Sequence, residues 1–230
     1  MRLVRHRDYV KALRHGVAAT IEHDGTPFGY DFATVVDVGA NRGQFAVFAA
    51  RRFPSATILC FEPLAPARAK LEAIVGDLRE ARVFQVALSD SAGDREMHVT
   101  RSDDSSSLLA PTERQVEASL SGATEVGVTQ VEVDRLDSIL DIADIERPAL
   151  LKIDVQGAEL DVLRGAEGVL GGFDEILVEC SFVELYSGQA LADDVAAFLV
   201  ERAFRLVGRS AVARDGQGQP LQADFLFRQA

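Results

Sequence analysis

The fold of this protein is indicated most clearly by one run, Thr34-Val-Val-Asp-Val-Gly-Ala-Asn-Arg-Gly-Gln44. Its apolar first part contains one acid, Asp37, and a glycine-containing turn follows from Gly39 to Gly43. The next residues, 45–52, have the pattern of a helix. A strand, a tight turn and a helix start allow the backbone to approach a nucleotide-like ligand closely.

A second acid, Glu62, stands 25 residues after Asp37, at the end of the next apolar run, 56–61. An acid at the end of the second strand of an α/β unit accepts hydrogen bonds from ribose hydroxyl groups. The turn and this acid together indicate a cofactor that contains a nucleoside.

The same turn argues against a dinucleotide cofactor. Dinucleotide sites use the pattern G-x-G-x-x-G, because the pyrophosphate lies against the backbone at a helix N-terminus. Here the middle glycine is absent, and Asp37 would repel a pyrophosphate but attract an ammonium group. S-adenosylmethionine carries an ammonium group, a sulfonium cation and a ribose, and no phosphate, so it fits better. The alternative is that Asp37 only caps the local backbone.

Composition limits the class of protein. The 230 residues carry a net charge of −12, and 47% of them are hydrophobic. This length suits one α/β domain, and the acidity disfavours a nucleic-acid partner. We expect no membrane span and no secretory signal, because no apolar run is long enough. Cys60 and Cys180 are expected to be buried free thiols in a protein of the reducing cytoplasm.

Strands and helices alternate along most of the chain, which predicts a parallel sheet covered on both faces. We expect a helical N-terminal segment over 1–30, with its helix at 8–21, and one domain over 31–230. An insertion around 93–133 is expected to hold a mobile loop and two short antiparallel strands, and the tail to form a hairpin. The expected strands are 34–38, 57–61, 82–87, 149–155 and 175–180, and the expected helices are 43–52, 65–76, one within 134–142, 159–170 and 192–202.

Six motifs, in this order along the chain, resemble the FkbM family of S-adenosylmethionine-dependent methyltransferases. They are Val36-Asp-Val-Gly-Ala-Asn-Arg-Gly43, Phe61-Glu-Pro63, Val86-Ala-Leu-Ser-Asp90, Ser105-Ser-Ser-Leu108, Leu151-Lys-Ile-Asp-Val-Gln-Gly-Ala-Glu159 and Glu184-Leu-Tyr-Ser-Gly-Gln189. The fifth is the most specific, although Gln156 stands where Glu is common. The resemblance implies a Rossmann-like class I methyltransferase fold, a three-layer sandwich. Its seven-stranded sheet is mostly parallel, with an antiparallel strand in the C-terminal hairpin.

The resemblance also implies an activity and a set of cofactor contacts. The implied activity is methylation of a hydroxyl group on a sugar or another small molecule. The residues implied to bind the cofactor are Asp37, Gly39, Asn41 and Gly43 for its methionine part, Glu62 for the ribose, and Ala87 and Ser89 for the adenine.

A charged cluster is expected to face the methyl group and the acceptor. Lys152 and Asp154 alternate on one strand and share a face, although a central parallel strand is normally apolar. Glu179 ends the neighbouring strand and Glu159 opens the next helix. We predict that Asp154 is the general base, with Lys152, Glu159 and Glu179 as the other catalytic residues. The alternative is a structural ion pair at Lys152, with Glu159 complementing its helix N-terminus.

Other polar residues are weaker candidates. His98 on the inserted strand is a second possible base, whereas His6, His15 and His23 are expected to be exposed. The Ser105–Leu108 motif is a candidate lid or substrate contact, and Tyr186 is a candidate lining residue of the acceptor pocket. The carboxylates could bind Mg²⁺ through oxygen, but nothing in their spacing requires it, so we expect no metal.

The sequence therefore predicts an S-adenosylmethionine-dependent O-methyltransferase with a small-molecule or carbohydrate acceptor and no nucleic-acid partner. A homodimer is one option for its assembly. Three alternatives stay open: an NAD-dependent oxidoreductase, a catalytically silent cofactor-binding domain, and a methyltransferase that acts on a protein.

Overall fold

Seven strands form the central sheet of the computed structural model, which describes residues 12–76, 80–118 and 122–230. The strand order is β3-β2-β1-β7-β8-β10-β9. Strand β10 pairs antiparallel with β8 and with β9, whereas β3, β2, β1, β7 and β8 pair in parallel. The strands are β1 (Thr34–Val38), β2 (Thr57–Phe61), β3 (Ala81–Phe84), β7 (Ala149–Ile153), β8 (Glu175–Ser181), β9 (Phe204–Arg214) and β10 (Pro220–Gln229).

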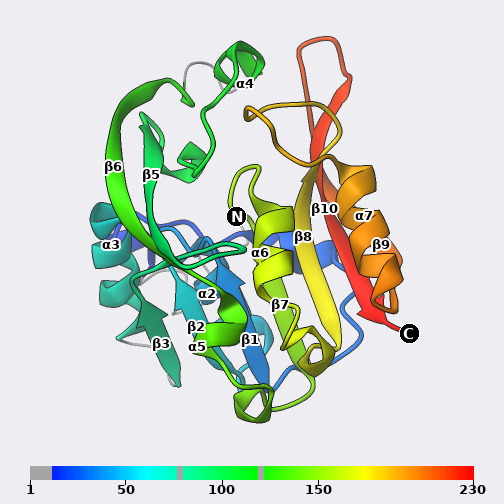
Figure 1. The fold of residues 1–230 in the computed structure, drawn as a ribbon. Coiled ribbons are helices and arrows are strands. Elements are labelled where there is room, and N and C mark those ends of the chain that lie inside the picture. Colours follow the sequence, from blue (N-terminus) through cyan, green and yellow to red (C-terminus); the bar gives the residue numbers. More distant parts are fainter. Residues whose placement is uncertain (1–11, 77–79, 119–121) are drawn as a thin grey trace.

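Helices cover both faces of this sheet, as Figure 1 shows. Because side chains alternate along a strand, neighbouring residues of β1 enter different cores. Val35 packs in the cluster that contains Phe45 and Phe48 of α2, and Val36 packs in the cluster that contains Val162 of α6. The helices are α2 (Gln44–Arg52), α3 (Ala65–Val75), α4 (Glu113–Ala118), α5 (Leu136–Ile139), α6 (Glu159–Gly165) and α7 (Ala192–Glu201), with 3-10 turns η2 (Ile21–Gly25), η3 (Asp103–Ser105), η4 (Ile142–Asp144) and η5 (Leu170–Gly172).

The insertion forms a separate three-stranded sheet of order β4-β6-β5. Its long strands, β5 (Gly93–Thr100) and β6 (Glu125–Asp134), are antiparallel, and β4 (Ala87–Leu88) pairs in parallel with β6. Figure 1 shows β5 and β6 curving away together from the main sheet. The predicted antiparallel pair is therefore present, and its strands are longer than expected.

Two predicted strands end earlier than the apolar pattern suggested. The expected strand 82–87 is split, because β3 ends at Phe84 and Ala87 pairs with Val133 of the inserted sheet. The expected strand 149–155 ends at Ile153, although the backbone amide of Asp154 still donates to the carbonyl oxygen of Val38 at 3.1 Å. An apolar run shows burial but not the identity of its pairing partner, which is why both strands were predicted too long.

The N-terminal segment is less helical than expected. Residues 12–14 are helical, but the helix ends at a turn in which Gly16 has φ +73°, and 17–20 are irregular before η2. The prediction of a helix reaching residue 21 is wrong, and its part at 8–11 lies outside the described residues. The helix expected over 159–170 ends at Gly165, and the one expected within 134–142 is the short α5.

Two simpler expectations concern the cysteines and the membrane. Cys60 and Cys180 are both buried and free. Within residues 12–76, 80–118 and 122–230, no helix has the length and apolarity needed to cross a membrane.

Candidate active site

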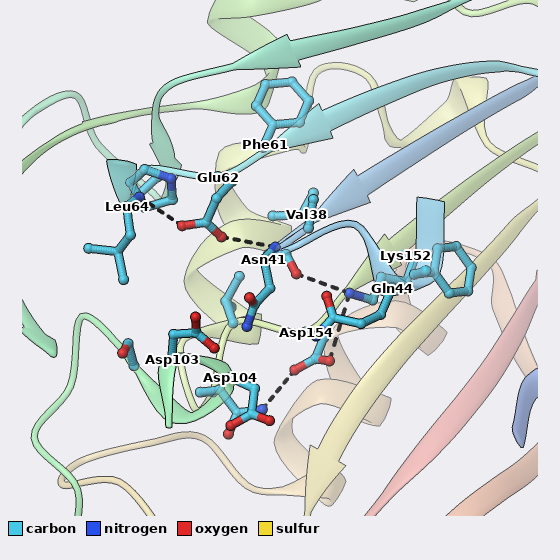
Figure 2. A pocket seen from close by; sticks show the side chains of 18 of the residues that line it. Val38, Asn41, Gln44, Phe61, Glu62, Leu64, Asp103, Asp104, Lys152 and Asp154 are labelled. Atoms are coloured by element: carbon cyan, nitrogen blue, oxygen red, sulfur yellow. Dashed lines mark hydrogen bonds and ion pairs between the residues drawn. The ribbon is translucent and has the colours of Figure 1, made fainter. Parts of the chain in front are cut away.

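A cavity of about 410 Å³ opens at the carboxyl ends of β1, β2 and β7 (Figure 2). Six of the eleven predicted site residues line this cavity. Gly39, Asn41, Glu62, Ala87, Lys152 and Asp154 line the cavity, together with residues that include Thr20, Glu22, His23, Asp103, Asp104 and Gln156. Asp37, Gly43, Ser89, Glu159 and Glu179 are not among its lining residues.

The glycine turn after β1 forms one wall. Gly39 has φ +75°, and a Cβ atom there would lie 1.9 Å from the carbonyl oxygen of Asp154. The amides of Gly39 and Ala40 both donate to the carbonyl oxygen of Phe61, at 3.2 and 3.0 Å. Only glycine allows this left-handed backbone to approach β7 so closely, so the turn presents its backbone to the cavity.

Glu62 connects this turn to the segment after β2. Its Oε2 accepts a hydrogen bond from the amide of Asn41 at 3.0 Å, and its Oε1 accepts one from Leu64 at 2.7 Å. Burial raises the pKa of Glu62 to about 7, although these two hydrogen bonds oppose the rise. Each carboxylate oxygen has a further lone pair, so Glu62 can still accept hydrogen bonds from the hydroxyl groups of a ribose.

Lys152 lies on the opposite side of the turn from Glu62, as Figure 2 shows. Its Nζ is 3.1 Å from Asp37 Oδ1 and 3.7 Å from Asp154 Oδ2, and it donates to the carbonyl oxygen of Gly39 at 3.3 Å. Burial by itself lowers the pKa of Lys152, but the carboxylates of Asp37 and Asp154 raise it above its ordinary value. The amine is therefore charged and surrounded by acceptors.

Asp37 lies beneath the cavity wall and faces Lys152, its register partner on β7. Its exposed fraction is 0%, so it meets Lys152 and does not border the cavity. Burial raises the pKa of Asp37, and the ammonium group of Lys152 opposes that rise. The expected direct contact with a cofactor ammonium group has no support in this placement, and a structural ion pair at Lys152 is present.

Gln156 joins two of the predicted catalytic carboxylates. Its Nε2 donates to Asp154 Oδ1 at 2.7 Å and to Glu179 Oε2 at 2.9 Å, and its Oε1 lies 2.9 Å from the hydroxyl group of Tyr186. The amide of Gln222 on β10 donates to the second oxygen of Glu179 at 2.6 Å. Asp154 and Glu179 are thus held close to each other, with Asp154 at the cavity and Glu179 behind Gln156.

Glu159 turns toward its own loop. It accepts hydrogen bonds from the amides of Gly157 at 2.9 Å and Val155 at 3.2 Å. Burial raises the pKa of Glu159 to about 7. These contacts hold the carboxylate against the loop between β7 and α6, just before its own helix.

The insertion forms a further part of the cavity wall. Arg42 Nε donates to Asp103 Oδ2 at 2.6 Å, which ties the glycine turn to η3. Ser107 Oγ donates to the carbonyl oxygen of Gln156 at 2.7 Å, and the hydroxyl group of Tyr186 lies 2.9 Å from the carbonyl oxygen of Ser105. The serine motif therefore contacts the loop after β7 and Tyr186, whereas Asp103 contacts the glycine turn.

Two other candidates lie away from the cavity. Ser89 is fully buried and its hydroxyl group accepts a hydrogen bond from Arg95 Nη1 at 2.9 Å, whereas the nearby Ala87 lines the cavity. His98 contacts Glu125 at 2.6 Å on the inserted sheet and is not a lining residue.

His23 was missed by the sequence analysis. Its expected exposure is wrong, because it is only 7% exposed and lines the cavity. Burial lowers the pKa of His23 to about 4, and Lys152 adds to this effect. A run of turn-forming residues gave no signal for burial, since the contacts that cover His23 come from α2 and β10.

The cavity is acidic. Five carboxylate residues line it against one basic residue, Lys152, whose charge already has partners. Such a wall suits a cationic ligand and opposes a pyrophosphate. In the part of the chain that the structure describes, no group of three or more His, Cys, Asp or Glu side chains could hold a metal ion. The five carboxylate residues that line the cavity are Glu22, Glu62, Asp103, Asp104 and Asp154.

A seven-stranded sheet of this order, with an antiparallel β10 and a cavity at the ends of β1 and β2, defines the class I S-adenosylmethionine-dependent methyltransferases. The comparison with protein families is more specific. The model of the methyltransferase FkbM domain matches residues 37–206, and the chain belongs to this family.

Curated relatives agree with this assignment, and a solved structure shares the fold. The chain is 37% identical over 164 residues to the 2-O-methyltransferase NoeI of Sinorhizobium fredii, which covers 67% of this chain and 66% of that protein. It is 29% identical over 195 residues to the methyltransferase sdnD of Sordaria araneosa, covering 74% and 73% of the two chains. The crystal structure of the methyltransferase FkbM from Methylobacillus flagellatus has a TM-score of 0.56 at 12% identity, over 87% of this chain and 45% of that one, which shows the shared fold.

Proposed function

We propose that this protein transfers the methyl group of S-adenosylmethionine to a hydroxyl group of a small molecule or sugar. The observation that carries the proposal is the acidic cavity, in which Glu62 and Asp154 lie on two sides of the glycine turn. The names of two similar proteins, the 2-O-methyltransferase NoeI and the 31-O-demethyl-FK506 methyltransferase FkbM of Streptomyces tacrolimicus, support oxygen as the accepting atom.

The residues of this cavity fit the cofactor. Glu62 would hold the ribose, the turn from Gly39 to Asn41 would hold the methionine part, and Ala87 would border the adenine. Asn41 Oδ1 is buried without a hydrogen-bond partner among the described residues, so it is available to an ammonium group. When bound, S-adenosylmethionine supplies an electrophilic methyl group on a sulfonium centre.

Asp154 would act on the acceptor. Gln156 occupies its Oδ1, and the side chain is 37% exposed, which leaves Oδ2 able to accept the proton of an acceptor hydroxyl group. A base in this place removes the proton as the oxygen attacks the methyl group. Lys152 would orient Asp154, because its ammonium group is shared among Asp37, Gly39 and Asp154.

Calorimetry and a transfer assay test the proposal. We expect S-adenosylmethionine and S-adenosylhomocysteine to bind and NAD not to bind. Exclusive binding of NAD would instead support the oxidoreductase alternative. Binding of the methyl donor without transfer to any hydroxyl-bearing acceptor would support a catalytically silent domain.

The role of Asp154 is tested by Asp154→Asn. We expect kcat to fall at least about 100-fold, the usual contribution of a general base, while the Kd of S-adenosylmethionine changes only several-fold. Asp161→Asn on α6 is a matched control, because Asp161 pairs with the exposed Arg164 and does not line the cavity. Near-normal turnover of Asp154→Asn would remove Asp154 as the base.

A further inference from the structure

Two residues of the N-terminal segment that line the cavity each carry a buried polar atom that makes no hydrogen bond within the described part of the chain. Thr20 Oγ1 and His23 Nδ1 have no hydrogen-bond partner among the described residues, and both side chains line the cavity. Leaving a buried polar group unsatisfied costs about 1–3 kcal/mol. A ligand that supplies the missing hydrogen bonds is a physical reason for such an arrangement.

The His23 ring is held at the end of the cavity that contains Lys152 and Asp154. Its centroid lies 5.2 Å from that of Phe45 and 5.6 Å from that of Phe48. The Phe45 ring is also 5.6 Å from Lys152 Nζ. His23 Nδ1 lies 3.4 Å from Asp224 Oδ2, and Asp224 on β10 is the register partner of Glu179. His23 is therefore on the side of the proposed base.

We propose that His23, positioned by Asp224, contacts the acceptor and selects an uncharged one that has a polar group, such as a second hydroxyl, beside the methylated oxygen. This inference rests on the proposed function. Both residues lie outside the span 37–206 that matches the family. The contact therefore belongs to a part of this chain that the shared domain does not define.

The chemistry of the surroundings points to this class of acceptor. The low pKa of His23 keeps its imidazole neutral near pH 7, so one ring nitrogen can face Asp224 while the other exchanges a hydrogen bond with a hydroxyl group. A phosphate or carboxylate on the acceptor would meet the carboxylates of Asp154 and Glu22, which line the cavity. The nearby cation, Lys152, already has Asp37 and Asp154 as partners.

His23→Phe and His23→Asn separate packing from hydrogen bonding. Phenylalanine retains an aromatic ring against Phe45 and Phe48 but loses both nitrogens, whereas asparagine retains a side chain that can donate and accept hydrogen bonds. With an uncharged methyl glycoside as the probe, we expect His23→Phe to raise KM about tenfold, the effect of losing one good hydrogen bond. We expect kcat to stay within about twofold and His23→Asn to recover most of the lost affinity.

Asp224→Asn tests the positioning role. It should raise KM for the same glycoside in the wild-type background and have no further effect in His23→Phe, since the residue acts through His23. The Kd of S-adenosylmethionine should be unchanged in all variants, and thermal unfolding should confirm that each one folds.

Three results would overturn the inference. These are an unchanged KM in His23→Phe, a cofactor Kd that rises together with KM, or faster methylation of uronates and sugar phosphates than of neutral glycosides. Failure of the proposed function looks different, because the wild-type protein would then bind S-adenosylmethionine and methylate no hydroxyl acceptor at all.

Discussion

The two halves of the cavity are built in different ways. On the side proposed to bind the cofactor, Glu62 is held by backbone amides, and the turn from Gly39 to Gly43 follows directly from β1. On the acceptor side, Asp154 and Glu179 are held by the side-chain amides of other residues. The first half depends on local backbone geometry, and the second depends on side chains that only the complete fold brings together.

The two constructions should respond differently to substitution. A backbone-built turn needs a few glycines and one acid, so it tolerates change elsewhere in the chain. A network of side chains from β7, β8, β10 and the N-terminal segment changes whenever one of its members changes. We expect substitutions in the two halves to separate cofactor affinity from acceptor affinity.

Lys152→Met should have the largest effect, because Lys152 joins the two halves. The substitution leaves Asp37 buried without its partner, which typically costs about 3–5 kcal/mol. Chemical denaturation measures this loss of stability, and adding Asp37→Asn should recover part of it. Lys70→Met on the exposed face of α3 is the matched control, with an expected change within about 0.5 kcal/mol. Equal stabilities of the two variants would show that the buried pair is unimportant.

Gly39→Ala should disrupt the cofactor half next. The added Cβ would lie 1.9 Å from the carbonyl oxygen of Asp154, and φ is +75°. Left-handed strain and local displacement together should cost about 2–3 kcal/mol and weaken the binding of S-adenosylmethionine. Calorimetry and denaturation measure the two effects. Gly25→Ala, where a Cβ meets no atom within 4 Å, is the control. Wild-type affinity in Gly39→Ala would contradict a backbone-built cofactor side.

Glu62→Gln should have the smallest effect, which is a loss of the pH dependence of cofactor binding. The pKa of Glu62 is about 7, so its carboxyl group is mostly ionised at pH 8 and mostly protonated at pH 6. Because the ionised form accepts the ribose hydroxyl groups, the affinity of the wild type for S-adenosylmethionine should fall about tenfold from pH 8 to pH 6. Calorimetry at both values should show weaker binding without this pH dependence in Glu62→Gln.

The control for this prediction lies in the acceptor half. Burial also raises the pKa of Asp224 to about 7, so Asp224→Asn should keep the pH dependence of cofactor binding if the two halves are independent.

Without cofactor, the raised pKa of Glu62 affects the stability of the folded protein. The unfolded state loses the proton first, so this group lowers stability as pH rises from about 4.5 to about 7.

Most strands and helices could be predicted from the pattern, and the errors have a common cause. The periodicity located β1, β2, β8 and α2 correctly, because each is a buried element with clear boundaries. The pattern could not show that Ala87 leaves the main sheet to pair with Val133, since pairing partners lie far apart in the sequence. The burial of His23 was missed for the same reason.

The sequence by itself determined the family and the position of the glycine turn that lines the cavity. Gly39, Gly43 and Glu62 stand just after the ends of β1 and β2, so their spacing can be read directly from the sequence. Only the tertiary structure decided that Asp37 lies beneath the wall against Lys152, that Gln156 joins Asp154 to Glu179, and that His23 meets Asp224. These contacts join segments that are distant in sequence, and their partners are chosen by packing.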